Sequence, residues 1–286
     1  MRKSDVEIIV PKSQEEWLNY KKKTVGGSEV AAVLGLNPYQ SPRDVFLLKT
    51  GRTEFAEPTL NMKRGTYFEH ALVELWANEE KHTVIKSSQK NILYIDKKYP
   101  FLSCTPDRVF LHKNGGKRTL EVKTTFGRYD EPLTQWLYQL QYCMSFTKHD
   151  YGELLWEYPQ PTVVYKCLEF EKNEEAQKIM REYVCDWWNT YVVKDIEPPP
   201  INSNDILGKF PTELAGKITE ATQEIAVAYT NIKILQEKVN TATKEMEAEK
   251  ERVKLFMQDS EYITYDSTKL FSFKANKNGS RIFRVL

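Results

Sequence analysis

The stretch from Cys104 to Lys123, CTPDRVFLHKNGGKRTLEVK, holds two apolar runs on either side of a glycine-rich segment. Strand-forming residues dominate Phe101–Leu111 and Arg118–Thr124, and Lys113–Lys117 (KNGGK) supplies the turn between them. The pattern predicts a β-hairpin, and the hairpin fixes which charged side chains of the stretch share a face.

Three charged residues of this hairpin are expected to lie close together. Asp107 ends the segment CTPD, on the strand next to Glu121 and Lys123. Side chains alternate along a strand, so Glu121 and Lys123 point to one face while Val122 points to the other. The Val122 carbonyl lies between the acidic and the basic side chain and is a candidate metal ligand. A surface salt bridge at a hairpin edge is the simpler alternative for these residues.

Glu69 adds a third carboxylate from a predicted helix. It closes the segment Arg64–Glu69 (RGTYFE). The helix predicted over Tyr67–Glu79 has four apolar residues near one face: Phe68, Leu72, Leu75 and Trp76. Arg64 and Gly65 form a tight entry that aims the first turn into a cleft, and Arg64 is a candidate for DNA contact. Taken alone, Glu69 would be an ordinary exposed helical carboxylate.

Three acidic side chains converging beside a lysine suit Mg²⁺, a hard cation that takes oxygen ligands and keeps some of its waters. Mn²⁺ accepts the same kind of ligand and can substitute. A neighbouring ammonium group can position or activate a water. The combination of Glu69, Asp107, Glu121 and Lys123 therefore predicts metal-dependent cleavage of a phosphodiester, with nucleic acid as the substrate.

A glutamine-rich helix is predicted to follow the hairpin, from Pro132 to about Thr147. Gln139 shares its polar stripe with Gln135 and Tyr142. Gln139 is a candidate to hydrogen-bond a scissile phosphate or the attacking water, and Gln141 is a candidate for DNA contact. The alternative is that both are ordinary surface amides.

A basic run, Lys21 to Lys23, precedes Gly26-Gly27-Ser28 at the predicted start of another helix. Ser28 is a good N-cap for that helix, and Gly35 closes it. Lysine charge, the backbone N–H groups around Gly27 and the Ser28 hydroxyl together offer a site for an anion. If the cleavage site is nearby, that anion is a terminal 5′-phosphate and the enzyme acts from DNA ends. A solvated lysine run is the alternative.

The remaining elements complete an α/β (α+β) architecture. Helices are predicted over Glu15–Lys23, from Ser41-Pro42 to Gly51 and over Glu174–Val193, and further strands over Asn91–Ile95, Glu153–Tyr158 and Val163–Phe170. The third helix carries Ile179, Tyr183, Trp187 and Tyr191 at helical spacing. Pro198-Pro199-Pro200 is a stiff stop. We therefore expect a nuclease domain over residues 1–197 and a second domain over residues 198–286.

The second domain contains an apolar seam whose members are spaced alternately by four and three residues. Its members are Leu214, Ile218, Ala221, Ile225, Ala228, Ile232, Leu235, Val239, Ala242 and Met246, and Val253 and Phe256 keep the same register. The seam predicts a long coiled-coil helix or a helical hairpin. Tyr262–Tyr265, Leu270–Lys274 and Arg281–Val285 then predict a small β-meander, with Asn278-Gly279 as a turn.

Composition narrows the class of protein. At 286 residues and 41% hydrophobic content the chain can build a full-sized core, and a net charge of +1 excludes a polybasic coat for nucleic acid. The cysteines (Cys104, Cys143, Cys167 and Cys185) are widely spaced and are expected to be reduced structural thiols. The histidines (His70, His82, His112 and His149) show no paired spacing, which argues against a histidine-metal or Ser-His-Asp mechanism.

No apolar run approaches the roughly 18 residues of a membrane span, and the N-terminal MRKSDVEIIV lacks the apolar core of a signal peptide. We expect a soluble protein of the cytoplasm, which would be the host-cell cytoplasm if a phage encodes the chain.

Six short segments in order, GGSEVAAVLG, SPRDVFLLKTG, RGTYFE, CTPD, LEVK and QLQYCM, resemble those of the lambda-exonuclease-like (YqaJ-type) viral recombinases, a family of PD-(D/E)xK nucleases. The resemblance covers about Trp17 to Pro159. It implies a restriction-endonuclease-like core, in which a mixed central sheet is flanked by helices. The long C-terminal helix or coiled coil and the β-meander lie outside it.

The resemblance also implies roles for the candidate residues. Four groups would surround one or two Mg²⁺ ions: the side chains of Glu69, Asp107 and Glu121 and the carbonyl of Val122. Lys123 and Gln139 would lie near the nucleophilic water and the scissile phosphate. Ser28, with Lys21 seven positions earlier, would form the 5′-phosphate pocket. Lambda exonuclease has an arginine at the earlier position, and a lysine is a point charge that cannot form its bidentate fork.

The function implied by the resemblance is 5′→3′ degradation of one strand of linear double-stranded DNA. The product would be a 3′ single-stranded tail for a single-strand annealing protein in phage-type recombination, and a ring-shaped homotrimer would thread the substrate. Two alternatives stay open: a structure-specific or Cas4-like endonuclease, and a non-enzymatic interaction module built on the coiled coil. The presence of Asp107, Glu121 and Lys123 favours an enzyme.

Overall fold

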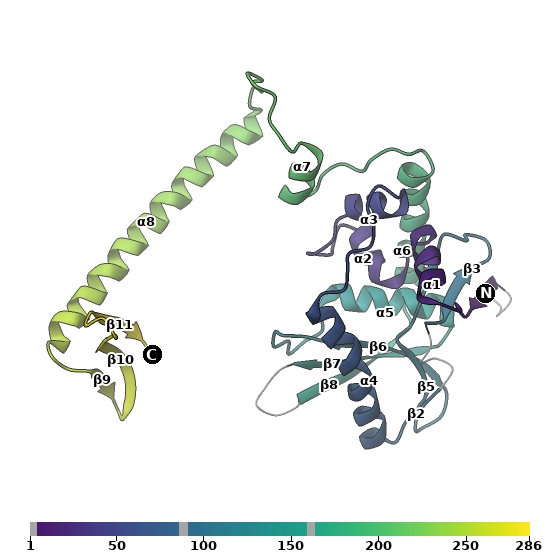
Figure 1. Ribbon diagram of the computed structural model, residues 1–286, viewed down its shortest axis with the longest axis horizontal. Helices are drawn as coiled ribbons and strands as arrows, with labels where there is room; N and C mark the ends of the chain where they lie inside the picture. The colour runs from purple at the N-terminus through teal and green to yellow at the C-terminus, as the bar shows by residue number, and fades with distance from the viewer. Residues whose placement is uncertain (1–4, 86–90, 159–163) are drawn as a thin grey trace. The chain divides into compact units, whose positions relative to one another are not determined.

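The computed structural model describes residues 5–85, 91–158 and 164–286 (Figure 1). The chain forms two compact units, Met1–Thr212 and Glu213–Leu286. The first unit contains every residue proposed above for catalysis or DNA binding, so its architecture determines how the site is built.

A five-stranded sheet forms the centre of the first unit. Its strands, in spatial order, are β2 (Thr83–Val84), β5 (Arg108–Leu111), β6 (Lys117–Thr124), β7 (Tyr151–Tyr158) and β8 (Val164–Glu171). The pair β6–β7 is parallel, and the other three pairs are antiparallel. The parallel pair requires a crossover, which α5 (Thr134–Thr147) supplies. The predicted mixed central sheet with flanking helices is confirmed.

The hairpin β5–β6 forms as predicted, with Gly115 and Gly116 at positive φ in its turn. The single strand expected over Phe101–Leu111 is instead two: β4 (Ser103–Cys104) ends before Pro106, and β5 begins at Arg108. Proline cannot donate to a ladder, so it breaks the strand at this point. The break leaves Asp107 at the start of β5.

Helices cover both faces of the sheet (Figure 1). On one face α4 (Leu60–Glu80) packs Leu72, Val73, Trp76 and Ala77 against the sheet residues Phe110, Leu120, Val122 and Leu155. On the other face α5 packs Trp136, Leu140 and Met144 against Leu154 and Trp156. The alternation along β6 therefore turns Glu121 and Lys123 away from α4.

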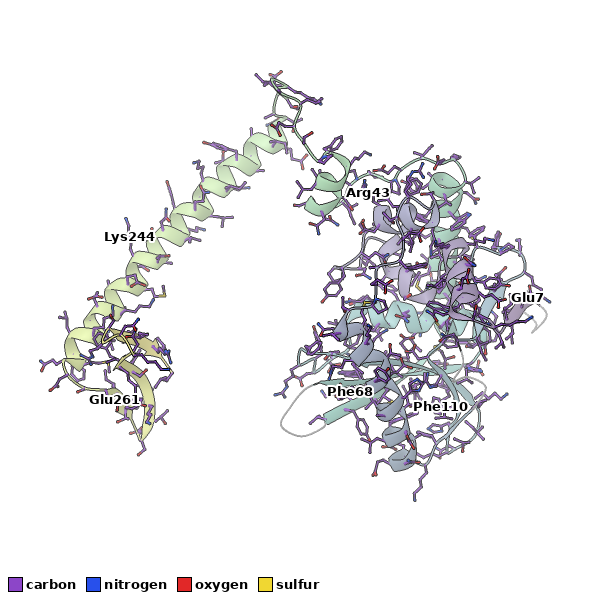
Figure 2. All side chains as sticks on the ribbon, in the orientation of Figure 1. Glu7, Arg43, Phe68, Phe110, Lys244 and Glu261 are labelled. Atoms are coloured by element: carbon purple, nitrogen blue, oxygen red, sulfur yellow. The ribbon has the colours of Figure 1, made fainter. Side chains whose placement is uncertain are left out.

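The prediction for α4 was partly wrong. The helix begins at Leu60, capped by Thr59, so Arg64 and Gly65 lie inside it and form no entry turn. A Cβ at Gly65 would lie 3.3 Å from Thr124 Oγ1, so glycine serves a close contact with β6 here. Phe68 is 49% exposed and lies off the buried face, as does Leu75 (Figure 2).

A second layer of helices packs beside α5. It consists of α1 (Gln14–Lys23), α2 (Gly27–Val33), α3 (Pro42–Lys49), α6 (Glu174–Trp187) and the π-helical turn η3 (Trp188–Val192). Ser41 caps α3 as predicted, with Pro42 at its first position, and Gly35 and Gly51 follow their helices at positive φ. The N-cap of α2 is Gly26, not the predicted Ser28, because the helix starts two residues earlier.

The buried face of α6 also differs from the prediction. Met180, Val184 and Trp187 face the core, while Ile179 and Tyr183 are exposed. An additional antiparallel sheet, β1 (Val6–Ile9), β3 (Leu93–Asp96) and β4, closes the edge of this layer. The predicted strand at Asn91–Ile95 corresponds to β3, and Val163 of the last predicted strand lies outside the described residues.

The first unit extends past the predicted boundary at residue 197. Helix α7 (Ser203–Lys209) packs on α3, where Asp205 is buried and accepts hydrogen bonds from the Ser41 hydroxyl (2.6 Å) and the Ile201 N–H (3.0 Å). Arg43 of α3, labelled in Figure 2, donates to Glu197 at 2.7 Å. The hydrogen bonds of Asp205 tie the segment after the prolines to the first unit.

The second unit contains α8 (Gln223–Met257) and a three-stranded antiparallel sheet of β9 (Tyr262–Tyr265), β10 (Thr268–Ala275) and β11 (Arg281–Val285). The β-meander forms as predicted, with Gly279 at positive φ in its last turn. The long helix forms too, but it starts at Gln223, so Leu214, Ile218 and Ala221 of the predicted seam precede it. Side chains along α8 near Lys244 project into solvent (Figure 2).

Within the residues that the structure describes, no helix has the length and apolarity needed to cross a membrane.

Asp205 provides a test of how far the first unit extends. Replacing Asp205 by Ala strands the Ser41 hydroxyl in a buried position and removes the partner of the Ile201 N–H, so we expect the free energy of unfolding to fall by about 1–3 kcal/mol. Urea titration followed by circular dichroism measures the change. The neighbouring exposed substitution Asn204→Ala should stay within about 0.5 kcal/mol. Equal stability of Asp205→Ala and the parent would contradict the packing of α7.

Candidate active site

The β5–β6 hairpin brings three of the predicted residues together. Asp107 Oδ2 accepts a hydrogen bond from the Val122 N–H at 2.8 Å, and Lys123 Nζ donates to Glu121 Oε1 at 2.6 Å. Antiparallel register pairs Arg108 with Leu120, so the Asp107 side chain extends beside β6 beyond the last residue that pairs with β5. The carboxylates and the ammonium group thus meet where β5 begins.

Helix α5 contributes Gln139 from the face of the sheet that Glu121 and Lys123 occupy. Gln139 Oε1 accepts from Lys123 Nζ at 3.0 Å. Lys123 therefore bridges a carboxylate of β6 and an amide of α5, which fixes the position of its ammonium group. The structure brings the predicted Gln139 into contact with the predicted strand residues.

Glu69 approaches from α4 through an arginine that the sequence analysis did not single out. Arg108 Nη1 lies 2.8 Å from Glu69 Oε1, and the same guanidinium contacts the Asp107 carbonyl and His70 Nδ1. Burial and the neighbouring Asp107 carboxylate raise the pKa of Glu69 to about 7, although Arg108 lowers it. Such a raised pKa is the expected sign of acidic groups crowded together without a cation.

Glu121 is the most constrained residue of the group. Its side chain is fully buried, and Oε2 has no hydrogen-bond partner among the described residues. Burial, together with the Asp107 carboxylate, holds the pKa of Glu121 well above its ordinary value. A buried carboxylate oxygen without a partner is costly, and a divalent cation would satisfy it. The donor set of this site fits a hard cation.

The Val122 carbonyl points to the strand edge at which the Asp107 carboxylate lies. The N–H and C=O of one strand residue point to the same edge, and the Val122 N–H points to Asp107. Its carbonyl is therefore directed toward the carboxylates, past the end of β5. Glu69, Asp107, Glu121 and the Val122 carbonyl would hold a divalent ion, which supplies Lewis acidity and an activated water when bound.

Lys123 keeps its charge in this setting. Burial lowers the pKa of Lys123, but Glu121 and Asp107 raise it further, so the net pKa lies above the ordinary value. A charged ammonium group beside two carboxylates can hold a phosphate or orient a water.

The predicted anion site lies directly beside α5. Lys21 Nζ is 3.4 Å from Ser28 Oγ, and Ser28 is exposed while Lys21 is nearly buried. A Cβ at Gly27 would lie 2.8 Å from Cys143 Sγ and 3.4 Å from Gln139 Cγ. Only glycine lets the backbone approach α5 this closely. Gly27 therefore connects the Lys21–Ser28 group to Gln139 and, through it, to Lys123.

Two predicted DNA-binding residues are engaged elsewhere. Gln141 donates to the Glu171 carbonyl and accepts from the Asn173 N–H, so its amide joins α5 to the start of α6. Its contact with DNA stays a prediction. Arg64 donates to Glu157 at 3.0 Å and stacks over aromatic rings, with a quarter of its side chain exposed. It stays a candidate for the backbone of a bound strand.

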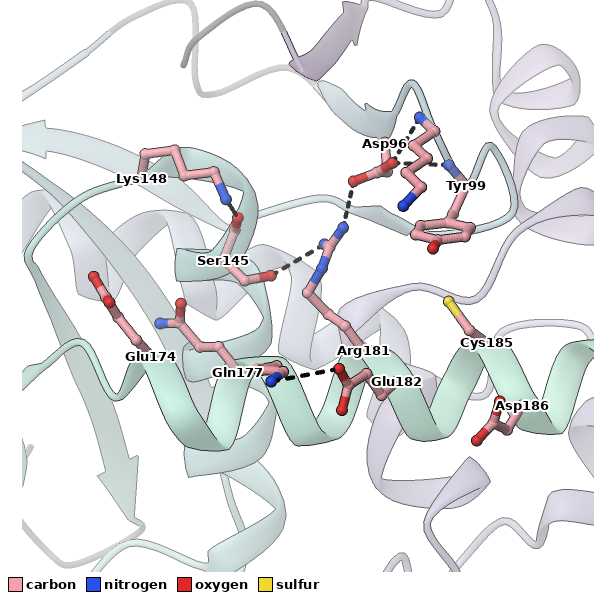
Figure 3. A pocket seen from close by; sticks show the side chains of 12 residues that line it. Asp96, Tyr99, Ser145, Lys148, Glu174, Gln177, Arg181, Glu182, Cys185 and Asp186 are labelled. Atoms are coloured by element: carbon pink, nitrogen blue, oxygen red, sulfur yellow. Dashed lines mark hydrogen bonds and ion pairs between the residues drawn. The ribbon is translucent and has the colours of Figure 1, made fainter. Parts of the chain in front are cut away.

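A further hollow of the first unit is not this site. A cavity of about 630 Å³ lies between the start of α6 and the turn after β3. Arg181 is paired there with Asp96 and donates to Ser145 (Figure 3). Because its buried charges are paired with one another and none of the predicted residues lines it, we assign it no catalytic role.

A cluster that sequence spacing missed is formed by His82, His112 and Glu153, whose ligand atoms lie within 4.8 Å of one another. Adjacent strands bring these residues together across long sequence separations. Each ring accepts a backbone N–H at Nδ1, and Glu153 is paired with Arg118 at 2.6 Å. Those polar groups already have partners, unlike Glu121 Oε2, so the carboxylate site is the better cation site.

A mixed sheet flanked by helices, with carboxylates and a lysine gathered on adjacent strands, defines the restriction-endonuclease-like class of α/β proteins. Residues 16–150 match the family described as the YqaJ-like viral recombinase domain.

Comparison with known proteins finds a relative that aligns with most of this chain. Uncharacterized protein YqaJ of Bacillus subtilis (strain 168) is 25% identical over 264 residues, covering 87% of this chain and 80% of the relative. That coverage exceeds the first unit, so the match extends into the second.

Two solved structures share the fold. An alkaline exonuclease (LHK-Exo) from Laribacter hongkongensis is 17% identical, covers 63% of this chain and 94% of its own, and has a TM-score of 0.51. LHK-Exo in complex with dAMP is 16% identical, covers 68% of this chain and 97% of its own, and also scores 0.51.

Glu121 and Glu153 allow a matched test of where a divalent ion binds. Both are buried carboxylates on neighbouring strands. We expect Glu121→Gln to weaken Mn²⁺ binding by at least about 10-fold, because a ligand is lost, while Glu153→Gln leaves it unchanged. Isothermal titration calorimetry with Mn²⁺ measures both. Loss of binding in Glu153→Gln alone would assign the ion to the histidine cluster instead.

Proposed function

We propose that this protein is a Mg²⁺-dependent 5′→3′ exonuclease that degrades one strand of linear double-stranded DNA. The product is duplex DNA with a 3′ single-stranded tail, the substrate of a single-strand annealing protein in phage-type recombination. The protein would act in the cytoplasm, which is the host cytoplasm if a phage encodes it. The match of residues 16–150 to the YqaJ-like viral recombinase domain supports the biological setting.

The single observation that carries the proposal is the buried Oε2 of Glu121, which lies beside Asp107 and Lys123 and has no hydrogen-bond partner among the residues that the structure describes. A structural salt bridge would satisfy both oxygens of a buried carboxylate, as Arg118 and Cys167 do for Glu153. Leaving one oxygen without a partner is costly, and proteins tolerate that cost at functional sites.

Each residue has a task in hydrolysis. Lys123, held by Glu121 and Gln139, places a positive charge where negative charge develops on the attacked phosphate. Gln139 can hydrogen-bond the attacking water or the scissile phosphate. If Glu69 turns from Arg108 toward Asp107 and Glu121, Arg108 keeps its contacts with the Asp107 carbonyl and His70 but loses its carboxylate partner, and its charge becomes available to the substrate.

Action from a 5′ end is supported by the contact between Gly27 and Gln139. A 5′-phosphate bound at Lys21 and Ser28 would sit next to the helix residue that serves the scissile phosphate. Lysine binds phosphate as a point charge and makes no bidentate fork, so we expect a preference for 5′-phosphorylated ends and not an absolute requirement.

A Cas4-like enzyme with an iron–sulfur cluster is poorly supported. The four cysteines are free, and no three of them form a ligand group within the described part of the chain. Cys104 and Cys143 are buried together between β4 and α5, while Cys167 and Cys185 lie on β8 and α6. Their separation agrees with the expectation of structural thiols.

The catalytic assignment is tested by two substitutions. Asp107→Ala and Lys123→Ala should each lower the rate of Mg²⁺-dependent digestion by about 10²-fold or more, because each removes a group that stabilises the transition state. Digestion of end-labelled linear duplex, with Mg²⁺ or EDTA, gives rate and polarity together. The exposed substitution Asp150→Asn is the control. Parental rates in either active-site variant, or equal cutting of circular duplex, would contradict the proposal.

The second unit is proposed to mediate assembly, either as a ring-shaped homotrimer or with the annealing partner. Apolar residues exposed along α8, among them Ile225, Ile232, Leu235 and Val239, support this role. A chain ending at Thr212 should retain folding but change its mass in solution or lose the partner. Light scattering after size exclusion checks the mass. Unchanged mass and unchanged partner binding would leave the helix without this role.

A further inference from the structure

Behind the Lys21–Ser28 group lies a buried ion pair that the sequence analysis did not single out. Lys49, the last residue of α3, has a side chain that is 0% exposed, and its Nζ donates to Glu29 Oε1 and to the Lys21 carbonyl, both at 2.6 Å. Glu29 Oε2 accepts from the Gly26 N–H at 2.9 Å and lies 3.7 Å from Lys21 Nζ. Glu29 thus stands between two lysines.

Gly26 makes this arrangement possible. A Cβ on Gly26 would lie 2.7 Å from Lys21 Nζ, closer than real Cβ contacts allow. Any larger residue would push the ammonium group away from the backbone and from Ser28. Gly26 and Gly27 therefore have separate purposes: the first admits Lys21, and the second admits α5.

The charges of the three buried side chains decide what the pocket can bind. Lys21 and Glu29 alone would cancel, leaving a neutral pair with no charge for a phosphate. Lys49 neutralises Glu29 from the interior side, so the group retains a net positive charge, carried by Lys21 next to the exposed Ser28 hydroxyl. Buried charges are weakly screened, so this balance has a large effect on a bound anion.

The ionisation of both partners agrees with that account. Burial raises the pKa of Glu29, but Lys21, Lys49 and the Gly26 N–H lower it further, so the net pKa falls below its ordinary value. Burial lowers the pKa of Lys49 to about 8, against the raising effect of Glu29. Both groups are therefore mainly charged at pH 7.

We infer that Lys49 is a positioning residue for a 5′-phosphate: it neutralises Glu29 and thereby frees the charge of Lys21 for the phosphate. Lys49 is too deeply buried to touch DNA and acts through Glu29. The inference deepens the proposed function and rests on its 5′-end pocket. It names the chemical reason why a lysine suffices for end recognition.

Equilibrium binding separates this inference from catalysis, because it needs no hydrolysis. The probes are two fluorescent blunt duplexes that differ only in a 5′-phosphate or a 5′-hydroxyl, titrated in EDTA and followed by anisotropy. The measured quantity is the ratio of the two Kd values. For the full-length protein we expect the phosphorylated duplex to bind about 10-fold more tightly, which corresponds to about 1.4 kcal/mol.

Two variants separate charge from structure. Lys49→Met removes the ammonium group and should bring the ratio of Kd values close to 1, because Glu29 then neutralises Lys21. Adding Glu29→Gln to Lys49→Met restores the net positive charge without restoring the bond to the Lys21 carbonyl, and glutamine still accepts from the Gly26 N–H. The double variant should recover the ratio to within about 3-fold of the parent.

An exposed lysine serves as the control. Lys113→Met removes an exposed lysine of the β5–β6 turn and should leave the ratio unchanged. A parental ratio in Lys49→Met, or a double variant as defective as Lys49→Met, would overturn the inference and leave the ion pair a structural element. A parental protein that binds both duplexes equally would also overturn it. Mg²⁺-dependent digestion, assayed separately, decides the proposed nuclease activity in every case.

Discussion

The site depends on one buried carboxylate. Glu121 lies on the central parallel pair of the sheet, fully buried, and Lys123 satisfies only one of its oxygens. Desolvating a carboxylate is expensive unless every lone pair finds a partner. The local structure reduces that cost in part: β6 turns Lys123 to the same face, α5 supplies Gln139 to hold it, and burial raises the pKa of Glu121. The remaining oxygen is the reason to expect a cation.

Two functional groups are joined across a single close contact. The carboxylates and Lys123 belong to the sheet, whereas Lys21, Ser28, Glu29 and Lys49 belong to the helical layer. Gly27 lies against Gln139 and Cys143 of α5, so the two groups share one helix. A 5′-phosphate in the helical layer would place the first internucleotide linkages of the same strand next to the sheet. End recognition and cleavage would then be coupled by geometry alone.

Local patterns predicted the elements that carry the site. Alternation and a glycine-rich turn were enough for the β5–β6 hairpin, and with it for Asp107, Glu121 and Lys123. Helix ends were harder to predict. The sequence predicts a tight entry to α4 at Arg64 and Gly65, but both residues lie inside the helix, where Gly65 closely approaches Thr124. The predicted apolar seam also included residues that precede the start of α8 at Gln223, because heptad spacing does not by itself determine where a helix starts.

Groups assembled from distant segments could not be predicted from spacing. His82, His112 and Glu153 meet only because β2, β5, β6 and β7 are neighbours in the sheet. Lys49 had the appearance of an ordinary lysine in the last turn of a helix. Its burial against Glu29 follows from the packing of α1, α2 and α3, which no sequence pattern encodes.

The most direct measurement is anomalous diffraction from crystals soaked in Mn²⁺. The account predicts a peak about 2.0–2.4 Å from carboxylate oxygens of Asp107 and Glu121, where a hard divalent cation binds oxygen. Absence of a peak between these side chains, or a peak only at His82 and His112, would contradict it.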